Sequence, residues 1–146
     1  MSEKKMTTLI ECDAAFRDAC DRHPAINKYR FGDPYEREQI TRSLPCAILQ
    51  LVPFRSDLQT TTYKFRFYIF SLISRDESDW LHVVSDCHQT MNDILNTVAA
   101  EEDIFLDLTV VNYTPFRQKW DDSVGGVWAD VDILVRRNDD ACYQPD

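Results

Sequence analysis

The first part of the chain carries apolar side chains at helical spacing. Between residues 6 and 21 they follow one another at steps of three and four positions, which is typical of an amphipathic helix with one face against a core. Thr7 or Thr8 stands near the start of this pattern, and His23-Pro24 ends it. We therefore predict an N-terminal helix that buries one side.

A longer helical stripe follows Ser78-Asp79, a pair suited to cap the N-terminus of a helix. The stripe continues for about five turns and predicts a helix over residues 80–100. We expect this helix to bury these apolar residues against a sheet: Leu81, Val84, Met91, Ile94 and Val98.

Strict alternation in residues 63–73 predicts a strand. Phe67 faces one way with other apolar residues, whereas Lys64 and Arg66 face the other way. Polar residues 55–62 precede the strand. They predict a mobile, exposed hairpin tip that is too long for a two-residue turn.

Three further stretches predict strands: residues 44–52, 104–111 and 127–135. The first is bracketed by Pro45 and Pro53, which favours a place near a sheet edge. The other two straddle residues 115–126, which we expect to form a loop. Residues 27–43 keep neither a helical nor a strand period, so they predict a long surface connection.

The order of these elements is helix, strand, strand, helix, strand, strand. It predicts an α+β fold in which two helices pack on one face of a mainly antiparallel four-stranded sheet. The chain has 146 residues, a length that fits one domain over residues 1–146. Residues 138–146 form an acidic tail to that domain.

Composition and charge narrow the classes of function. Hydrophobic residues make up 44% of the chain and glycines number only three, which argues against disorder and against Gly-rich phosphate loops. The net charge of −9 repels nucleic-acid backbones and anionic membranes. No apolar stretch approaches the roughly 20 residues of a spanning helix, and no signal peptide is expected.

The chemistry-bearing residues predict neither a metal site nor a cofactor site. The cysteines are odd in number and form no C-x-x-C pair, so we expect free thiols in a reduced compartment: Cys12, Cys20, Cys46, Cys87 and Cys142. Cys20 with His23, and Cys87 with His88, fall short of the four ligands that a structural zinc needs. Asp121-Asp122 and Asp139-Asp140 lack the spacing of a calcium loop and are typical of turns.

Catalysis is also not expected. Cys87, Asp86 and the nearby His82 or His88 have the side-chain types of a nucleophilic site. Neighbours on a helix point about 100° apart, however, so Cys87 and His88 cannot face each other for proton transfer. No phosphate-binding or hydrolase motif is present. We predict that the protein is not an enzyme.

What remains is surface chemistry. Aromatic residues crowd the later loops and the outward strand positions, and Trp and Tyr often carry the binding energy of protein interfaces. Basic residues are interspersed; a solvated face explains them more simply than a site for an acidic partner. Our candidate contact residues are these: Arg66, Phe116, Trp120, Trp128, Arg37 and Arg42.

Several features occur together along the chain. The N-terminal helix is followed by a Leu44-Pro45-Cys46 strand start, a long hairpin that ends in an aromatic strand, a helix carrying Val83-Val84-Ser85-Asp86, and a closing segment from Trp120-Asp121-Asp122-Ser123 through Val124-Gly125-Gly126 to Val131. In this arrangement, which covers most of residues 6–137, the chain resembles the small neck and tail-terminator proteins of tailed bacteriophages.

The resemblance implies a structural virion protein, assembled in the host cytoplasm, whose copies close into a ring at the head-proximal end of the tail. Such rings are commonly hexamers. They end growth of the tail tube, contact tube and neck or connector proteins, and let genomic DNA pass without sequence-specific binding. The same resemblance also fits an adaptor, stopper or tail-completion ring, and it implies no catalytic residue.

A ring needs contact surfaces between copies. We expect them in three long segments: residues 54–63, 115–126 and 29–42. The residues alone leave two other classes open. A small cytosolic regulatory or ligand-binding α+β domain would be favoured by a ligand pocket, and a small enzyme would require a cleft that joins Cys87 with His82 and His88.

Overall fold

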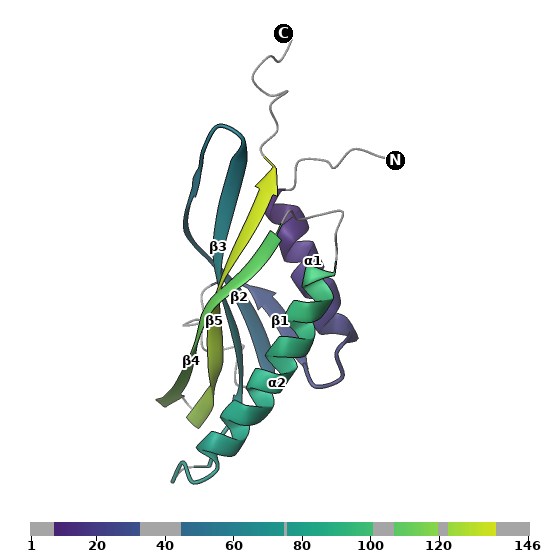
Figure 1. Cartoon of the computed structure of the whole chain (residues 1–146). Helices are drawn as coiled ribbons and strands as arrows, with labels where there is room; N and C mark the ends of the chain where they lie inside the picture. The colour runs from purple at the N-terminus through teal and green to yellow at the C-terminus, as the bar shows by residue number, and fades with distance from the viewer. Residues whose placement is uncertain (1–7, 33–44, 75, 101–106, 120–122, 137–146) are drawn as a thin grey trace.

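The computed structural model describes residues 8–32, 45–74, 76–100, 107–119 and 123–136. Two helices lie on one face of a twisted five-stranded sheet, and the opposite face of the sheet carries no described helix (Figure 1). The α+β class and the placement of both helices on one face are thus as predicted. The number of strands and their directions are not.

The sheet is mixed rather than purely antiparallel. Its order is β1-β2-β3-β5-β4, and it is formed by these strands: β1 (Lys28–Phe31), β2 (Cys46–Ser56), β3 (Thr60–Leu72), β4 (Asp107–Lys119) and β5 (Ser123–Arg136). Strand β1 runs parallel to β2, and every other neighbouring pair is antiparallel. The predicted four-stranded sheet therefore lacked one edge strand.

The missed strand is β1, which lies inside the predicted surface connection of residues 27–43. It has only four residues, too few to display a period of two. Tertiary contacts stabilise it instead: the Tyr29 hydroxyl donates to Asp13 at 2.7 Å, and the Arg17 guanidinium lies 5.5 Å from the Tyr29 ring. A parallel return to β2 also requires a long connection, which accounts for the aperiodic stretch that follows β1.

Helix α1 (Leu9–Arg22) begins and ends as the sequence predicts. Thr8 forms a capping box with Glu11: its hydroxyl accepts from the Glu11 backbone N–H at 3.2 Å, and the Glu11 carboxylate accepts from the Thr8 N–H at 2.9 Å. His23 is the C-cap. The buried face of α1 carries Phe16, which is fully buried against the sheet.

Helix α2 (Trp80–Ala99) follows Asp79 but buries a slightly different stripe from the predicted one. Met91, Ile94 and Val98 are buried as expected, and Val84 is half-buried. The prediction that Leu81 is buried is wrong, because 74% of this residue is exposed. The first turn is held by Trp80, whose indole N–H donates to the Phe116 carbonyl at 2.8 Å, so the next residue points about 100° away from the sheet.

The predicted loop of residues 115–126 is also wrong. Strand β4 continues through Pro115 to Lys119, and β5 already begins at Ser123. Proline is tolerated because β4 is the last strand of the sheet and Pro115 need not donate to a further neighbour. Position 126, inside β5, has room only for glycine, since a Cβ there would lie 2.1 Å from the Ile69 carbonyl oxygen.

The core lies between the helices and the sheet. Phe16 packs edge-on against Phe67, with 5.0 Å between ring centroids, and α2 adds Met91 and Ile94. The cysteines Cys12, Cys20, Cys46 and Cys87 are free and buried, in agreement with the thiol prediction, whereas Cys142 lies outside the described residues. Among the described helices, none combines the length and apolarity that crossing a bilayer requires.

Candidate interaction surface

The face of the sheet without helices carries an aromatic cluster, formed by Tyr68, Phe70, Phe116 and Trp128. Strand register places it there, because Tyr68 pairs with Trp128 and Phe70 pairs with Gly126, beside Phe116. Phe116 lies 5.5 Å from Trp128 and 6.0 Å from Phe70 between ring centroids. Phe70 is fully buried, whereas Phe116 and Trp128 are half-exposed.

Charged residues border the aromatic cluster along the same face. The Arg66 guanidinium donates to Asp130 at 3.0 Å and lies 5.0 Å from the Trp128 ring centroid. Lys64 pairs with Asp132 at 3.1 Å one step along the strands. The hydrogen bond to Asp130 is the main cause of a raised pKa at Arg66. Both cations are therefore matched by carboxylates of the same chain.

Three of the six candidate contact residues thus come together: Arg66, Phe116 and Trp128. Trp120, Arg37 and Arg42 lie outside the described residues. Strand alternation already placed Arg66 and Trp128 on the outward side. Phe116 joins them only because β4 continues beyond residue 111, which the predicted loop did not allow.

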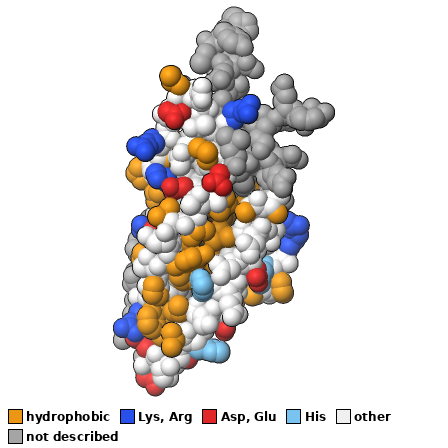
Figure 2. All heavy atoms as spheres, viewed as in Figure 1, with side chains coloured by type: hydrophobic (Ala, Val, Ile, Leu, Met, Phe, Trp, Pro, Cys, Tyr) orange, Lys and Arg blue, Asp and Glu red, His pale blue; other side chains and the backbone are white. Residues whose placement is uncertain are grey.

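Exposed apolar side chains mark a second surface, which the sequence analysis missed. Figure 2 shows hydrophobic side chains gathered in a band that runs down one face of the molecule. Leu81 on α2, and Val111 and Tyr113 on β4, are exposed by 74%, 56% and 39%. The Tyr113 ring stands edge-on to His88, and its hydroxyl donates to Asn92 at 2.8 Å. The Tyr113 contacts join β4 to α2, so these exposed apolar residues lie on neighbouring elements.

The hairpin between β2 and β3 ends in a third feature. Its turn is Asp57–Gln59, three residues long, in agreement with the prediction that two residues would not suffice. Leu58 is 85% exposed at this turn. On the stem, Phe54 stacks edge-on against Tyr63, with 4.9 Å between centroids. Most of the predicted contact segment of residues 54–63 therefore belongs to the two strands, and only its middle forms the turn.

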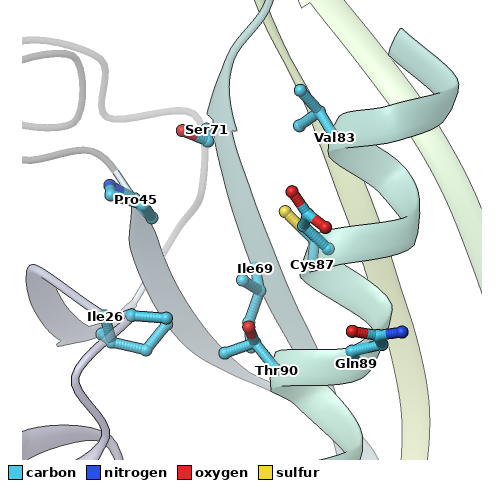
Figure 3. Close-up of a pocket in the computed structure, with 10 residues that line it drawn as sticks. Ile26, Pro45, Ile69, Ser71, Val83, Cys87, Gln89 and Thr90 are labelled. Carbon is cyan, nitrogen blue, oxygen red and sulfur yellow. The ribbon is translucent and has the colours of Figure 1, made fainter. Parts of the chain in front are cut away.

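A groove of about 450 Å³ lies between α2 and the start of β2 (Figure 3). We call it the α2 groove. Val83, Cys87 and Thr90 extend from the helix toward it, and Ile69 lies on the floor strand. Among the described residues, its lining is Ala25, Ile26, Pro45, Ile69, Ser71, Val83, Asp86, Cys87, Gln89 and Thr90.

The α2 groove does not assemble the nucleophilic site considered from the sequence. Burial, and then the negative charge of Asp86, raise the pKa of Cys87 to about 12, so its thiol is protonated at neutral pH. His82 is exposed and pairs with Asp86 at 3.4 Å, while His88 packs on Tyr113. Neither histidine lines the groove. Within the described residues, no three His, Cys, Asp or Glu side chains converge as metal ligands would.

Comparison with known proteins identifies no protein similar in sequence. No protein-family model matches the chain, and no curated protein matches it in sequence. The assignment of function therefore depends on the surfaces described above.

Proposed function

We propose that this protein is a structural subunit whose copies assemble into a closed ring at the head-proximal end of a bacteriophage tail. In this role it ends growth of the tail tube, contacts tube and neck proteins, and leaves a passage for DNA. It acts through contacts between proteins, without a cofactor and without catalysis. Assembly takes place in the host cytoplasm, and the mature protein is part of the virion.

One observation carries the proposal: several large apolar residues are exposed on α2 and on the neighbouring strand β4, namely Leu81, Val111 and Tyr113. Apolar side chains exposed on neighbouring elements are typical of a surface that another protein covers. Leu58, 85% exposed at the turn of the β2–β3 hairpin, offers a second contact away from that surface. Two separate contact surfaces on one subunit are what a ring requires, because each copy must contact two neighbours.

The structure also improves the choice of residues for a test. Arg66 is paired with Asp130, so Arg66→Glu would place two carboxylates together and disturb the sheet as well as any interface. Exposed positions avoid this problem. Leu81→Asp and Val111→Asp change exposed side chains, and we expect them to weaken assembly while each subunit stays folded.

Light scattering across a range of protein concentrations, together with electron microscopy of tails assembled with the protein, tests the proposal. We expect a species several times the 17.1 kDa subunit mass, or a ring on the tail end. Ile10→Asp, at an exposed apolar position of α1 outside these surfaces, serves as the charge control. A chain that stays monomeric at every concentration and does not join tails would overturn the proposal.

The α2 groove favours a second candidate, a small ligand-binding domain. At about 450 Å³ it falls within the usual range of small-molecule pockets, roughly 300–1,000 Å³, and its apolar floor carries a few polar groups. This candidate predicts a rise in melting temperature with a small apolar ligand, with the protein monomeric or dimeric. A ring without any ligand-induced shift would exclude it.

A further inference from the structure

The turn at the tip of the β2–β3 hairpin is closed by several hydrogen bonds. The Asp57 carboxylate accepts hydrogen bonds from the backbone N–H groups of Gln59 and Thr60, at 2.9 and 2.8 Å. The Asp57 N–H in turn donates to the Thr60 carbonyl at 2.9 Å, and the hydroxyls of Ser56 and Thr61 lie 2.6 Å apart. These bonds fix the turn that carries Leu58. The backbone of the turn is therefore ordered before binding, which lowers the backbone entropy lost when Leu58 is buried.

The α2 groove has the complementary chemistry. Its lining combines the apolar Ile26, Ile69 and Val83 and the thiol of Cys87 with a few polar side chains, among them Thr90. A mostly apolar pocket with a few polar groups suits a single hydrophobic anchor residue. The groove is large enough to take the whole side chain of a leucine.

The tip and the groove cannot meet within one copy. In Figure 1 the hairpin projects from one end of the molecule, whereas the N-terminal half of α2, which lines the groove, lies toward the opposite end. A contact between them must join two copies head to tail, and such a contact generates a ring when its rotation closes. Arg55 is exposed near the tip and opposite in charge to Asp86 at the groove, whereas the Asp57 carboxylate is engaged by the N–H groups of its own turn.

We propose that Leu58 of one copy inserts into the α2 groove of the next copy around the ring. The inference rests on the proposed ring assembly and identifies the contact that holds neighbouring copies together. It assigns the knob to residues Asp57–Gln59 and the socket to the apolar residues of the α2 groove. Each copy offers one knob and one socket, so the interaction repeats around the ring.

Disulfide cross-linking between two variants tests this contact. Leu58→Cys and Ser71→Cys, the latter lining the groove, are made in separate copies that carry tags of different size. Both carry Cys142→Ser, so that only the buried native thiols remain besides the introduced one. The two variants are co-expressed and mildly oxidised. We expect a mixed disulfide between the tip of one copy and the groove of another.

Ser85→Cys is the matched control, because it makes the same substitution on exposed α2 outside the groove lining. We expect the mixed disulfide to form several-fold more with Ser71→Cys than with Ser85→Cys. Equal yields would overturn the inference. A product dominated by Leu58→Cys joined to Leu58→Cys would overturn it too, because it indicates a tip-to-tip contact.

Assembly constants provide an independent measurement. Leu58→Asp should weaken association about ten-fold or more, since it removes a leucine that the contact buries and buries a charge instead. Ile10→Asp makes the matched change at an exposed apolar residue of α1, outside the tip and the groove, and should alter association about two-fold at most. Rings that form normally with Leu58→Asp overturn the contact but leave the proposed function intact. A parent protein that neither assembles nor cross-links overturns both.

Discussion

Phe16 holds α1 on the sheet, and truncating it should be among the most damaging single changes in the chain. The side chain is fully buried, and its ring lies 5.0 Å from Phe67 and 6.2 Å from Phe65 between centroids. Phe16→Ala removes the ring and leaves a cavity between α1 and the strands. We expect a loss of about 3–5 kcal/mol in the free energy of unfolding, because transfer and cavity costs add.

The size of this loss can be read in two assays. Urea denaturation should show a lower midpoint with an unchanged slope, since the surface exposed on unfolding hardly differs. A domain of this length loses about 2–4 °C in melting temperature per kcal/mol, so the Phe16→Ala variant should melt about 6–20 °C lower. Circular dichroism provides both measurements.

Ile10→Ala is the control from the same helix. Ile10 is 79% exposed, so its truncation should change the free energy of unfolding by less than about 0.5 kcal/mol. If Phe16→Ala costs less than about 1 kcal/mol, or no more than Ile10→Ala, then α1 is not packed on Phe65 and Phe67 as described. That result would refute the arrangement of the core.

Three further predictions test other parts of the structure. Met91→Ala should cost about 2–5 kcal/mol in the free energy of unfolding, because Met91 is buried. Leu81→Ala should cost less than about 0.5 kcal/mol, because Leu81 is exposed. Comparable costs would contradict the observation that α2 turns Met91, and not Leu81, toward the sheet. Gly126→Ala should lower the yield of folded protein sharply, since the added Cβ would overlap the Ile69 carbonyl, whereas a normal melting curve would show that β3 and β5 are not so close. A Cys142→Ser variant should react with a thiol reagent at pH 7 only after denaturation. Burial raises the pKa of Cys12, Cys20 and Cys87 to about 12, and the unfolded thiols ionise near pH 9, so stability should fall as the pH rises above 9; rapid labelling of the native protein would refute this.

Periodicity by itself was enough to determine the helices and the central strands. Both helices and the strand over residues 63–73 repeat their pattern many times, so one misplaced residue does not alter the assignment. The same alternation put Arg66 and Trp128 on the outward side of the sheet. These predictions depend only on which face of each element is buried, and that property is encoded locally.

The tertiary structure decided the sheet edges and the contact features. Strand β1 is stabilised by Tyr29 and its contact with Asp13 rather than by alternation, and β4 continues through Pro115 because no further strand needs that residue's missing N–H. Leu58 is exposed because its turn projects beyond the packed layers, and the α2 groove exists only where four separate segments meet. Such features arise from contacts between residues distant in the chain, so no local pattern encodes them.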